Sequence, residues 1–223
     1  SVGYTGGQFR VDESGSATYR VPLNLPPGRG ALTPTLALAY SSAGGDGVMG
    51  WGWSVEGVST ITKCRKTVEA GDGANGSIDF AAGVWFDGKF HSAFCLDGQR
   101  LLLVSGNEGR VGAEYRTEID SFQTIVVESE EALSLGSATY YQPVAFKASR
   151  KDGTIVKFGK SSATDGRRLS QTVDGAASLP IASEWWQNEL RDTNGNSVAY
   201  SYARDGSGAS RGSLRLATIT YVG

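Results

Sequence analysis

Short stretches of alternating apolar and polar residues recur along the whole chain. In the clearest one, Ala17 to Leu25, every second residue is apolar: Tyr19, Val21, Leu23 and Leu25. Strict alternation predicts a β-strand with one buried face and one solvated face. Pro22 lies inside this strand and has no N–H to donate, so we expect an edge strand or a proline whose missing donor faces outward.

Further strand-like segments follow at short intervals: Thr35–Tyr40, Val58–Lys63, Leu101–Ser105, Tyr115–Ile119, Phe122–Val127, Val144–Ala148, Ile155–Phe158, Ile181–Leu190, Ser197–Tyr202 and Leu214–Tyr221. In the last one the apolar phase slips between Leu216 and Ile219, which predicts a bulge or burial on both faces. Only Ser129–Leu135 resembles a short turn of helix. The pattern predicts an all-β fold of about eleven short, mainly antiparallel strands in a sandwich or rolled sheet, with almost no helix.

Glycine-containing turns separate these segments, and the chain holds 31 glycines. Asp152–Gly153 and Asn194–Asn196 have the composition of hairpin turns, the second of type I′, because both supply residues that tolerate positive φ. The segments 70–77 and 161–178 are predicted to be long loops. We expect one domain over residues 1–223, and any internal boundary to lie in the loop 161–178.

Charge and hydropathy argue against nucleic-acid binding, membrane-surface binding and a membrane span. The chain has 21 basic and 23 acidic residues, a formal net charge of −2, without a run of either sign. Nucleic-acid and membrane-surface binders concentrate positive charge, so neither class is favoured. The purest apolar run is Leu101–Val104, far short of 18 residues, which predicts no membrane span. Because the sequence begins at Ser1 without a leader, it is interpreted as a processed or excised piece.

A family resemblance rests on several motifs in one order. The strings Gly15–Gly28, Leu32–Ser42, Gly50–Ser54 (Gly-Trp-Gly-Trp-Ser) and Ile61–Arg65 come first, and Phe94–Leu101, Lys151–Ile155 and Asp192–Asn196 follow. With these motifs the chain resembles the SpvB-type N-terminal domain. Such a domain opens the B component of bacterial insecticidal Tc toxin complexes and a related virulence-plasmid toxin.

The resemblance implies a structural part and no catalyst. In Tc B components the domain begins a β-rich, YD-repeat (Rhs-related) shell around a toxic C-terminal segment, and in the virulence-plasmid protein it precedes an ADP-ribosyltransferase domain. It also implies that downstream segments of the same polypeptide and partner toxin subunits are the binding partners, and that the protein is secreted or extracellular.

Two pairs of residues are candidates for a structural or binding role. Cys64 and Cys95 are the only cysteines and are a candidate disulfide, since paired thiols in secreted proteins are commonly bridged; two inert buried thiols remain the alternative. Trp51 and Trp53 would share one face of a strand, where they either plug a core or stack on a ligand. Trp85 is a further candidate for partner or ligand contact, and one of Trp185 and Trp186 is expected to be buried.

Catalytic, metal and cofactor sites are not predicted. His91 is the single histidine, and nothing local supplies it with a nucleophile and a carboxylate. Glu128-Ser129-Glu130 matches the Glu-x-Glu of ADP-ribosyltransferases, but the accompanying Ser-Thr-Ser string is missing. Cys64, His91 and Cys95 lack zinc-ligand spacing, and Asp192–Asn196 lacks the bidentate glutamate of a calcium loop.

Three functions therefore remain open at the level of sequence. The favoured one is a non-catalytic structural module that forms part of a toxin shell or delivery scaffold. The second is a carbohydrate-binding or adhesin-like module that would bind glycan through Trp51, Trp53 or Trp85. The third is an enzyme with two converging carboxylates, although no pair is selected among the acidic residues.

Overall fold

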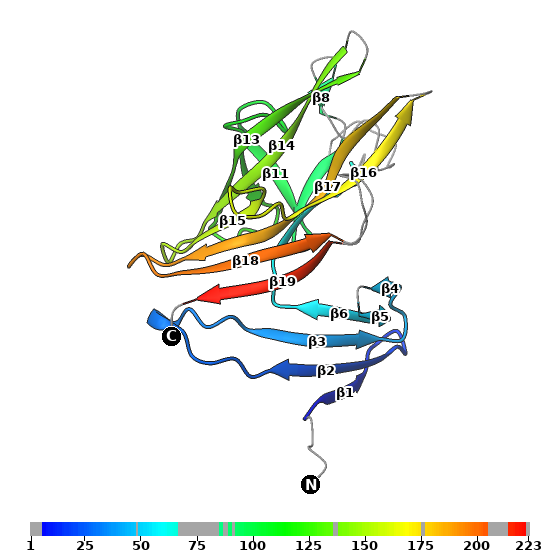
Figure 1. The fold of residues 1–223 in the computed structure, drawn as a ribbon, viewed down its shortest axis with the longest axis vertical. Coiled ribbons are helices and arrows are strands. Elements are labelled where there is room, and N and C mark those ends of the chain that lie inside the picture. Colours follow the sequence, from blue (N-terminus) through cyan, green and yellow to red (C-terminus); the bar gives the residue numbers. More distant parts are fainter. Residues whose placement is uncertain are drawn as a thin grey trace.

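The computed structural model describes residues 6–47, 49–66, 85–86, 89–90, 92–135, 138–174, 177–204 and 214–221. Strands and turns make up nearly all of this part of the chain, and its only helical element is the short 3-10 turn η1, Arg29–Ala31. The strands form sheets of 13, four and two members (Figure 1). No helix in the described residues is long and apolar enough to cross a membrane.

A closed barrel of eight strands is the central unit of the larger sheet. Each strand pairs antiparallel with the next, and β17 closes the ring by pairing with both β15 and β7. Its members are β7 (Thr60–Cys64), β10 (Ala93–Leu96), β11 (Gln99–Ser105), β12 (Glu114–Thr117), β13 (Thr124–Leu135), β14 (Ala138–Ser149), β15 (Ile155–Gly159) and β17 (Ala177–Arg191). Closure leaves these strands without free edges along the ring.

The barrel interior is a packed hydrophobic core, because every barrel strand turns alternate residues inward. The Phe94 ring meets the rings of Tyr115, Phe146 and Trp185 edge-on at centroid distances of 5.7, 5.2 and 5.6 Å. The Nε1–H of Trp185 donates to the backbone oxygen of Pro143 at 3.0 Å, which satisfies the indole inside the core. Trp185 is fully buried while Trp186 is half-buried, so the expected burial of one of them is confirmed.

Two long hairpins extend beyond the ring (Figure 1). One is β13–β14, and the other pairs β16 (Arg167–Asp174) with the first part of β17. Two predictions are therefore wrong: Ser129–Leu135 is strand, and the loop 161–178 contains β16. In both places a partner strand supplies ladder hydrogen bonds, and tertiary pairing overrides the weak local preference for helix or loop.

The far edge of the large sheet is formed by β18 (Ser197–Arg204) and β19 (Leu214–Tyr221), which continue outward from β17. The register of this pair shifts between Ser201 and Tyr202, and the ladder skips Ala217. This is the bulge predicted from the phase slip of the last strand. At the other end of the sheet lie β8 (Trp85–Phe86) and β9 (Lys89–Phe90), and β4 (Asp46–Gly47) and β5 (Gly50–Trp51) form the two-stranded sheet.

The N-terminal part of the chain forms the separate four-stranded sheet. Its order is β1 (Gln8–Val11), β2 (Ala17–Leu23), β3 (Leu36–Ser41) and β6 (Trp53–Glu56). β2 is therefore an inner strand, but β1 pairs only with Ala17–Arg20. Pro22 lies beyond the end of β1 and has its single neighbour on β3, so its missing donor costs no ladder bond.

Three hairpin loops share one construction, which differs from the predicted type I′ turn. In the loop after β17, Asp192 N donates to Asn196 O and Gly195 N donates to Asp192 O, with Gly195 at φ 85°. A type I′ turn needs positive φ at two successive residues, and Asn194 does not have it. The loops Arg150–Thr154 and Asp12–Ser16 repeat the same two bonds around Gly153 and Gly15.

The all-β prediction with almost no helix is confirmed, but the count of about eleven strands is too low, and of the two predicted forms the sandwich is wrong, because the larger sheet closes into a barrel. Each predicted segment overlaps a strand, with ends that differ from the predicted ones; β1, β4, β5, β6, β8, β9, β10 and β16 were missed. The missed strands are short or glycine-rich, or they fall where alternation is weak. Closure of the ring depends on pairs far apart in sequence, such as Thr60 with Trp186, which periodicity cannot reveal. The segment 70–77 lies outside the described residues.

Candidate functional site

An aromatic row crosses the four-stranded sheet. Phe9 pairs with Tyr19, Tyr19 with Tyr40, and Tyr40 with Trp53, so one residue from each strand stands in register on the same face. The Tyr40 and Trp53 rings lie 5.4 Å apart. Directly opposed aromatic pairs stabilise a sheet, by roughly 0.2–1 kcal/mol each.

The same face continues as an apolar surface beside this row. Val21, Leu38 and Val55 form the next row in register, followed by the pair Leu23 and Leu36. No hydrophobic core cluster of the described residues includes this face; Phe9 is 66% and Leu23 37% exposed, whereas Val21 and Leu36 are buried. An apolar sheet face of this kind marks an interaction surface, so we name these residues and the aromatic row the N-terminal apolar face.

The opposite face of the same sheet is polar. Arg20 on β2 donates to Glu56 on β6 across the intervening strand β3, with Nε and Oε2 2.8 Å apart. Both side chains are about half exposed, so this ion pair contributes little to stability. The strong difference between the two faces orients the sheet, because only one face gains from being covered.

The two tryptophans of the Gly-Trp-Gly-Trp-Ser string do not share a strand face, which corrects the prediction. Trp51 ends β5 and is 67% exposed, whereas Trp53 begins β6 and packs on Tyr40. Gly52 separates them at φ 79°, and the Tyr40 ring covers it so closely that a Cβ would clash. The chain therefore turns between the rings, and they do not form one stacking platform. Trp85 lies in β8 opposite Tyr141, and its side chain is outside the described part.

Cys64 and Cys95 form a disulfide between neighbouring barrel strands, with Cα atoms 5.9 Å apart. Cys64 pairs with Ala93 and Cys95 with Thr62, so the bridge runs diagonally across β7 and β10. Lys63 and Phe94 are buried between these positions, which places the disulfide on the outer face of the ring. It closes the chain between the two strands and excludes both sulfurs from metal or nucleophile chemistry.

Lys63 is an unusual inward-facing residue of the barrel. It follows Ile61 on the interior face of β7, is 6% exposed, and its Nζ has no hydrogen-bond partner among the residues that the structure describes. Burial lowers the pKa of this amine to about 7, because a charged ammonium is poorly solvated in the core. Sequence analysis missed Lys63, although the alternation Ile61-Thr62-Lys63 already placed it on the face of Ile61.

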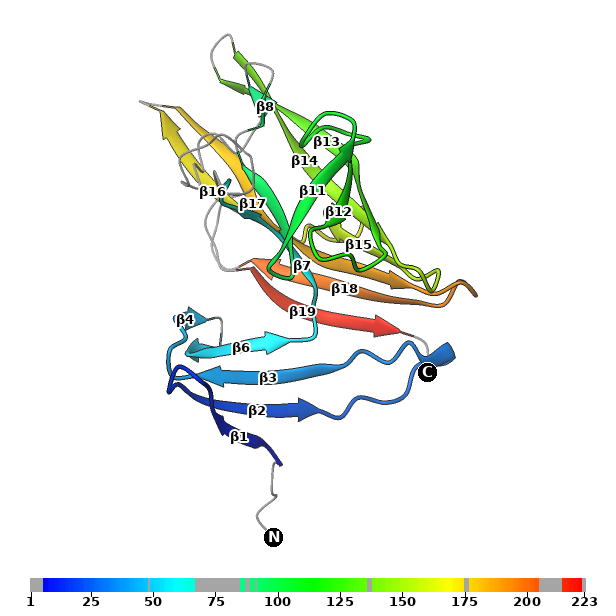
Figure 2. The same ribbon diagram turned by 180° about the vertical axis from the view of Figure 1, so that it is seen from behind.

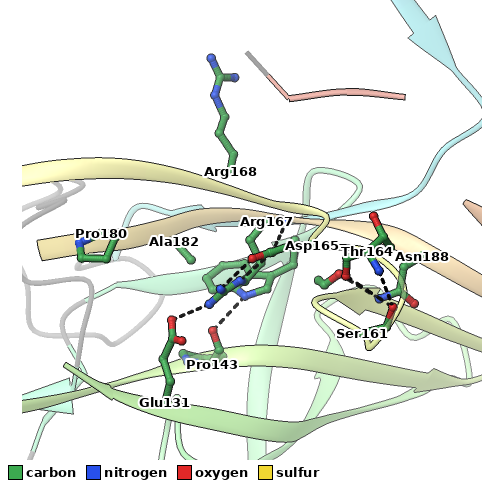
Figure 3. A network of polar contacts seen from close by, with 12 residues as sticks. Glu131, Pro143, Ser161, Thr164, Asp165, Arg167, Arg168, Pro180, Ala182 and Asn188 are labelled. Atoms are coloured by element: carbon green, nitrogen blue, oxygen red, sulfur yellow. Dashed lines mark hydrogen bonds and ion pairs between the residues drawn. The ribbon is translucent and has the colours of Figure 1, made fainter. Parts of the chain in front are cut away.

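A network of ion pairs joins the two long hairpins (Figure 3). Arg167 on β16 is 4% exposed; its Nε and Nη2 donate to Asp165 at 2.9 Å, and its Nη1 donates to Glu131 on β13 at 2.5 Å. Arg204 on β18 approaches Asp165 at 3.5 Å. Burial alone would raise the pKa of Asp165, but the hydrogen bonds and charges of the two arginines outweigh it and hold this pKa below its ordinary value.

Gln142 extends this network into the backbone. It is fully buried on β14 and donates both to Glu131 Oε1 at 2.7 Å and to the backbone oxygen of Pro180 at 3.0 Å. Its own Oε1 accepts from Ala182 N at 2.9 Å. Because every partner is itself part of a barrel strand or hairpin, the network has a structural role: it fixes the angle between β13–β14 and β16–β17.

The sequence-level candidates for chemistry do not converge in the described residues. Glu130 accepts two hydrogen bonds from Arg110 and one from Val111 N, while Glu128 lies 3.8 Å from Lys147. Arg110 lowers the pKa of Glu130 mainly through its hydrogen bonds. His91 is outside the described part, and no group of three His, Cys, Asp or Glu side chains within that part is arranged to hold a metal.

A comparison with family models and a comparison with solved structures both find similarity to SpvB proteins. Residues 11–71 match the family model of the Salmonella virulence plasmid 65 kDa B protein, SpvB. Among solved structures, the N-terminal domain of the effector protein SpvB from Salmonella typhimurium is 22% identical, covers 90% of this chain and 63% of that one, and has a TM-score of 0.54. Comparison with curated proteins finds no match.

Toxin-complex structures match over almost the whole chain. The TcdB2–TccC3 crystal structure is 17% identical, with a TM-score of 0.62 over 97% of this chain. The Photorhabdus luminescens Tc holotoxin pore is 18% identical, with a TM-score of 0.61 over 98%. The chain spans only 10% of each of these two. Residues 11–71 thus carry the SpvB family sequence, and the chain as a whole has the fold of an SpvB-type N-terminal domain.

Proposed function

We propose that this chain is a non-catalytic structural module from the N-terminal part of a secreted bacterial toxin-complex or virulence protein. The main observation that supports this proposal is that the family match and the N-terminal apolar face fall on largely the same residues. The residues that match the SpvB family model, 11–71, include β2, β3 and β6, which build most of the N-terminal apolar face. The part of the chain with the family sequence thus also carries most of an apolar sheet face that lies outside the hydrophobic core clusters of the described residues.

The proposed mechanism is mechanical. The closed barrel, held by its aromatic core, the Cys64–Cys95 bridge and the Arg167 network, acts as a rigid block. The four-stranded sheet on this block is the surface that downstream segments of the same polypeptide, or partner toxin subunits, would cover. Covering the N-terminal apolar face would add roughly 25 cal/mol of favourable free energy for every Å² of apolar surface removed from water.

The non-enzymatic part of the proposal is supported by how the polar side chains are used. Arg167, Glu130 and Gln142 each make several hydrogen bonds to other protein groups, which supports a structural use of these side chains. The glycan-binding alternative is not favoured, because Trp51 and Trp53 do not form a shared platform.

The direct test mixes this chain with the separately produced downstream segment of its parent polypeptide. We expect a stable complex in size-exclusion chromatography and a higher melting temperature. Replacing Phe9 and Leu23, both exposed on the N-terminal apolar face, by serine should weaken the complex at least tenfold without lowering the stability of the free chain. A complex of unchanged affinity, or none with the unaltered chain, would contradict the proposal.

A further inference from the structure

β1 has an open outer edge at the border of the four-stranded sheet. Among the described residues it pairs only with β2, and both views show it as the outermost strand of this sheet (Figures 1 and 2). All four of its side chains are exposed, so the strand lies open to solvent. We name Gln8–Val11, with its unpaired side, the β1 edge.

The backbone groups that point away from β2 belong to Phe9 and Val11. Asp12 N donates to Ser16 O at 3.0 Å across the hairpin, so these two residues form a hydrogen-bonded pair. Hydrogen-bonded pairs alternate with non-hydrogen-bonded pairs along an antiparallel ladder, so the next residue of β1 that bonds β2 is Arg10. The N–H and C=O groups of Phe9 and Val11 therefore have no ladder partner and face outward.

The side chains of the same two residues are apolar and exposed. Phe9 is 66% and Val11 61% exposed. Both lie on the apolar side of the sheet, because Phe9 stands in register with Tyr19 and Val11 follows two residues later in the strand. Each residue thus offers an outward donor and acceptor beside an exposed apolar side chain, and an added strand would satisfy both needs.

The other side of the β1 edge is polar and carries a net positive charge. A groove of about 520 Å³ lies over the polar face of the sheet, and its lining includes Gln8, Arg10, Arg20 and Glu56. Glu56 is paired with Arg20, whereas none of the ion pairs between described residues includes Arg10. An acidic side chain on an added strand would have Arg10 as its cross-strand neighbour.

We propose that the β1 edge binds one extended segment of a partner polypeptide in which apolar and acidic residues alternate. Its apolar residues would continue the aromatic row that ends at Phe9, and an acidic residue would lie opposite Arg10. The inference rests on the proposed function and deepens it, because it names the kind of partner segment and its mode of binding, which is strand addition.

The test supplies such a segment to the intact chain. About eight alternating valine and glutamate residues are fused before Ser1 through a Gly-Ser linker, which gives the segment a high effective concentration at the edge. The matched control has lysine in place of every glutamate. Hydrogen exchange is followed by NMR at the amides of Phe9 and Val11, which face outward, and at the amide of Arg10, which already bonds β2.

We expect the valine–glutamate extension to slow exchange at Phe9 and Val11 by about tenfold or more, and the valine–lysine extension to protect them about threefold less. Arg10→Glu should reverse this order. Val11→Pro removes an outward N–H without breaking a bond to β2, so it should reduce the protection of Phe9, whereas Val11→Ala should retain it. Melting temperatures of the unextended variants check that the sheet stays intact.

Failure of both extensions to protect Phe9 and Val11, or equal protection by the two, would overturn the inference. Protection that Val11→Pro leaves unchanged would also overturn it, because side chains would then pack without strand pairing. A concentration-dependent dimer of the unextended chain with these amides protected would assign the edge to a second copy, which again overturns the inference.

The same measurements separate this inference from the proposed function. If the amides are protected as expected but the downstream segment forms no complex with the chain, the inference holds and the proposed function fails. If the downstream segment binds but the valine–glutamate extension protects neither amide, the proposed function holds and the inference fails.

Discussion

Arg167 and Asp165 form a two-point ion pair inside the network that joins the long hairpins, with both hydrogen bonds at 2.9 Å. Arg167 lies almost fully buried, and its remaining donor reaches Glu131 on another strand. The neighbouring Arg168 pairs with Glu184 at 3.2 Å but is 55% exposed. Two adjacent arginines thus make similar contacts in very different surroundings, which allows a matched comparison.

Replacing Arg167 by alanine should destabilise the chain by about 3–5 kcal/mol, because Asp165 and Glu131 would keep their charges without a buried partner. Replacing Arg168 by alanine should change the stability by less than about 1 kcal/mol. Urea unfolding followed by tryptophan fluorescence measures both. Equal effects of the two substitutions would show that the network does not join the hairpins.

Lys63 predicts a dependence of stability on pH. Its pKa is lowered to about 7 in the folded chain but returns to its ordinary value of 10.5 on unfolding, so the unfolded chain binds more protons between these values. Stability should therefore rise with pH above about 7, and below pH 7 the full cost of the buried lysine remains.

The substitution Lys63→Met should stabilise the chain at pH 7 by several kcal/mol, and the gain should shrink as the pH rises toward 10. The control is Lys160→Met at an exposed position, for which we expect no such trend. Urea midpoints measured between pH 6 and 10 provide the comparison. If the increase in stability caused by Lys63→Met did not vary with pH, the Lys63 amine would be solvated in the folded chain, and the prediction would be wrong.

The Cys64–Cys95 bridge should contribute measurably to stability. It links residues 31 positions apart, and closing a loop of this length in the unfolded chain is worth about 3–4 kcal/mol. Reduction with dithiothreitol, or the double change Cys64→Ser with Cys95→Ser, should lower the melting temperature. As a control, dithiothreitol should not lower the melting temperature of the doubly substituted chain any further. The prediction would be contradicted if neither reduction of the unaltered chain nor the double substitution lowered the melting temperature.

Gly57 should tolerate no side chain, because it lies where the four-stranded sheet passes into the barrel. It has φ 98°, and a Cβ there would overlap the backbone oxygen of Thr35. Gly57→Ala should cost more than about 2 kcal/mol, since strain and a backbone clash add together. Gly45, with open space around it, is the control, and Gly45→Ala should be nearly neutral in the same thermal melts.

Much of the strand content could be predicted from alternation, and β2, β3 and the bulge at Ala217 show why. Their side chains alternate between an apolar and a polar or small residue, so the period of two is visible in the residues themselves. The strand Ser129–Leu135 could not be predicted in this way. Glu130 and Glu131 there pair with Arg110 and Arg167, and such partners are distant in sequence.

The candidate site, too, could be predicted from the sequence only in part. Tyr19 and Tyr40 stood out in sequence because they occupy regular positions of predicted strands, and Trp53 stood out through its Gly-Trp-Gly-Trp-Ser string. Their alignment into one row depends on the registers of three strand pairs, and a shift of one residue in any of them would turn a ring to the other face.

The order of residues by itself determined the β character of this protein, most of its turns and its likeness to SpvB-type domains. These are local properties, because they depend on the spacing of side chains that are neighbours in the sequence. Tertiary structure alone decided that the ring closes between β15, β17 and β7, and that the aromatic residues of the four-stranded sheet align in one row. The physical reason is that ladder hydrogen bonds join generic backbone groups, so their partners are chosen by the packing of the whole chain.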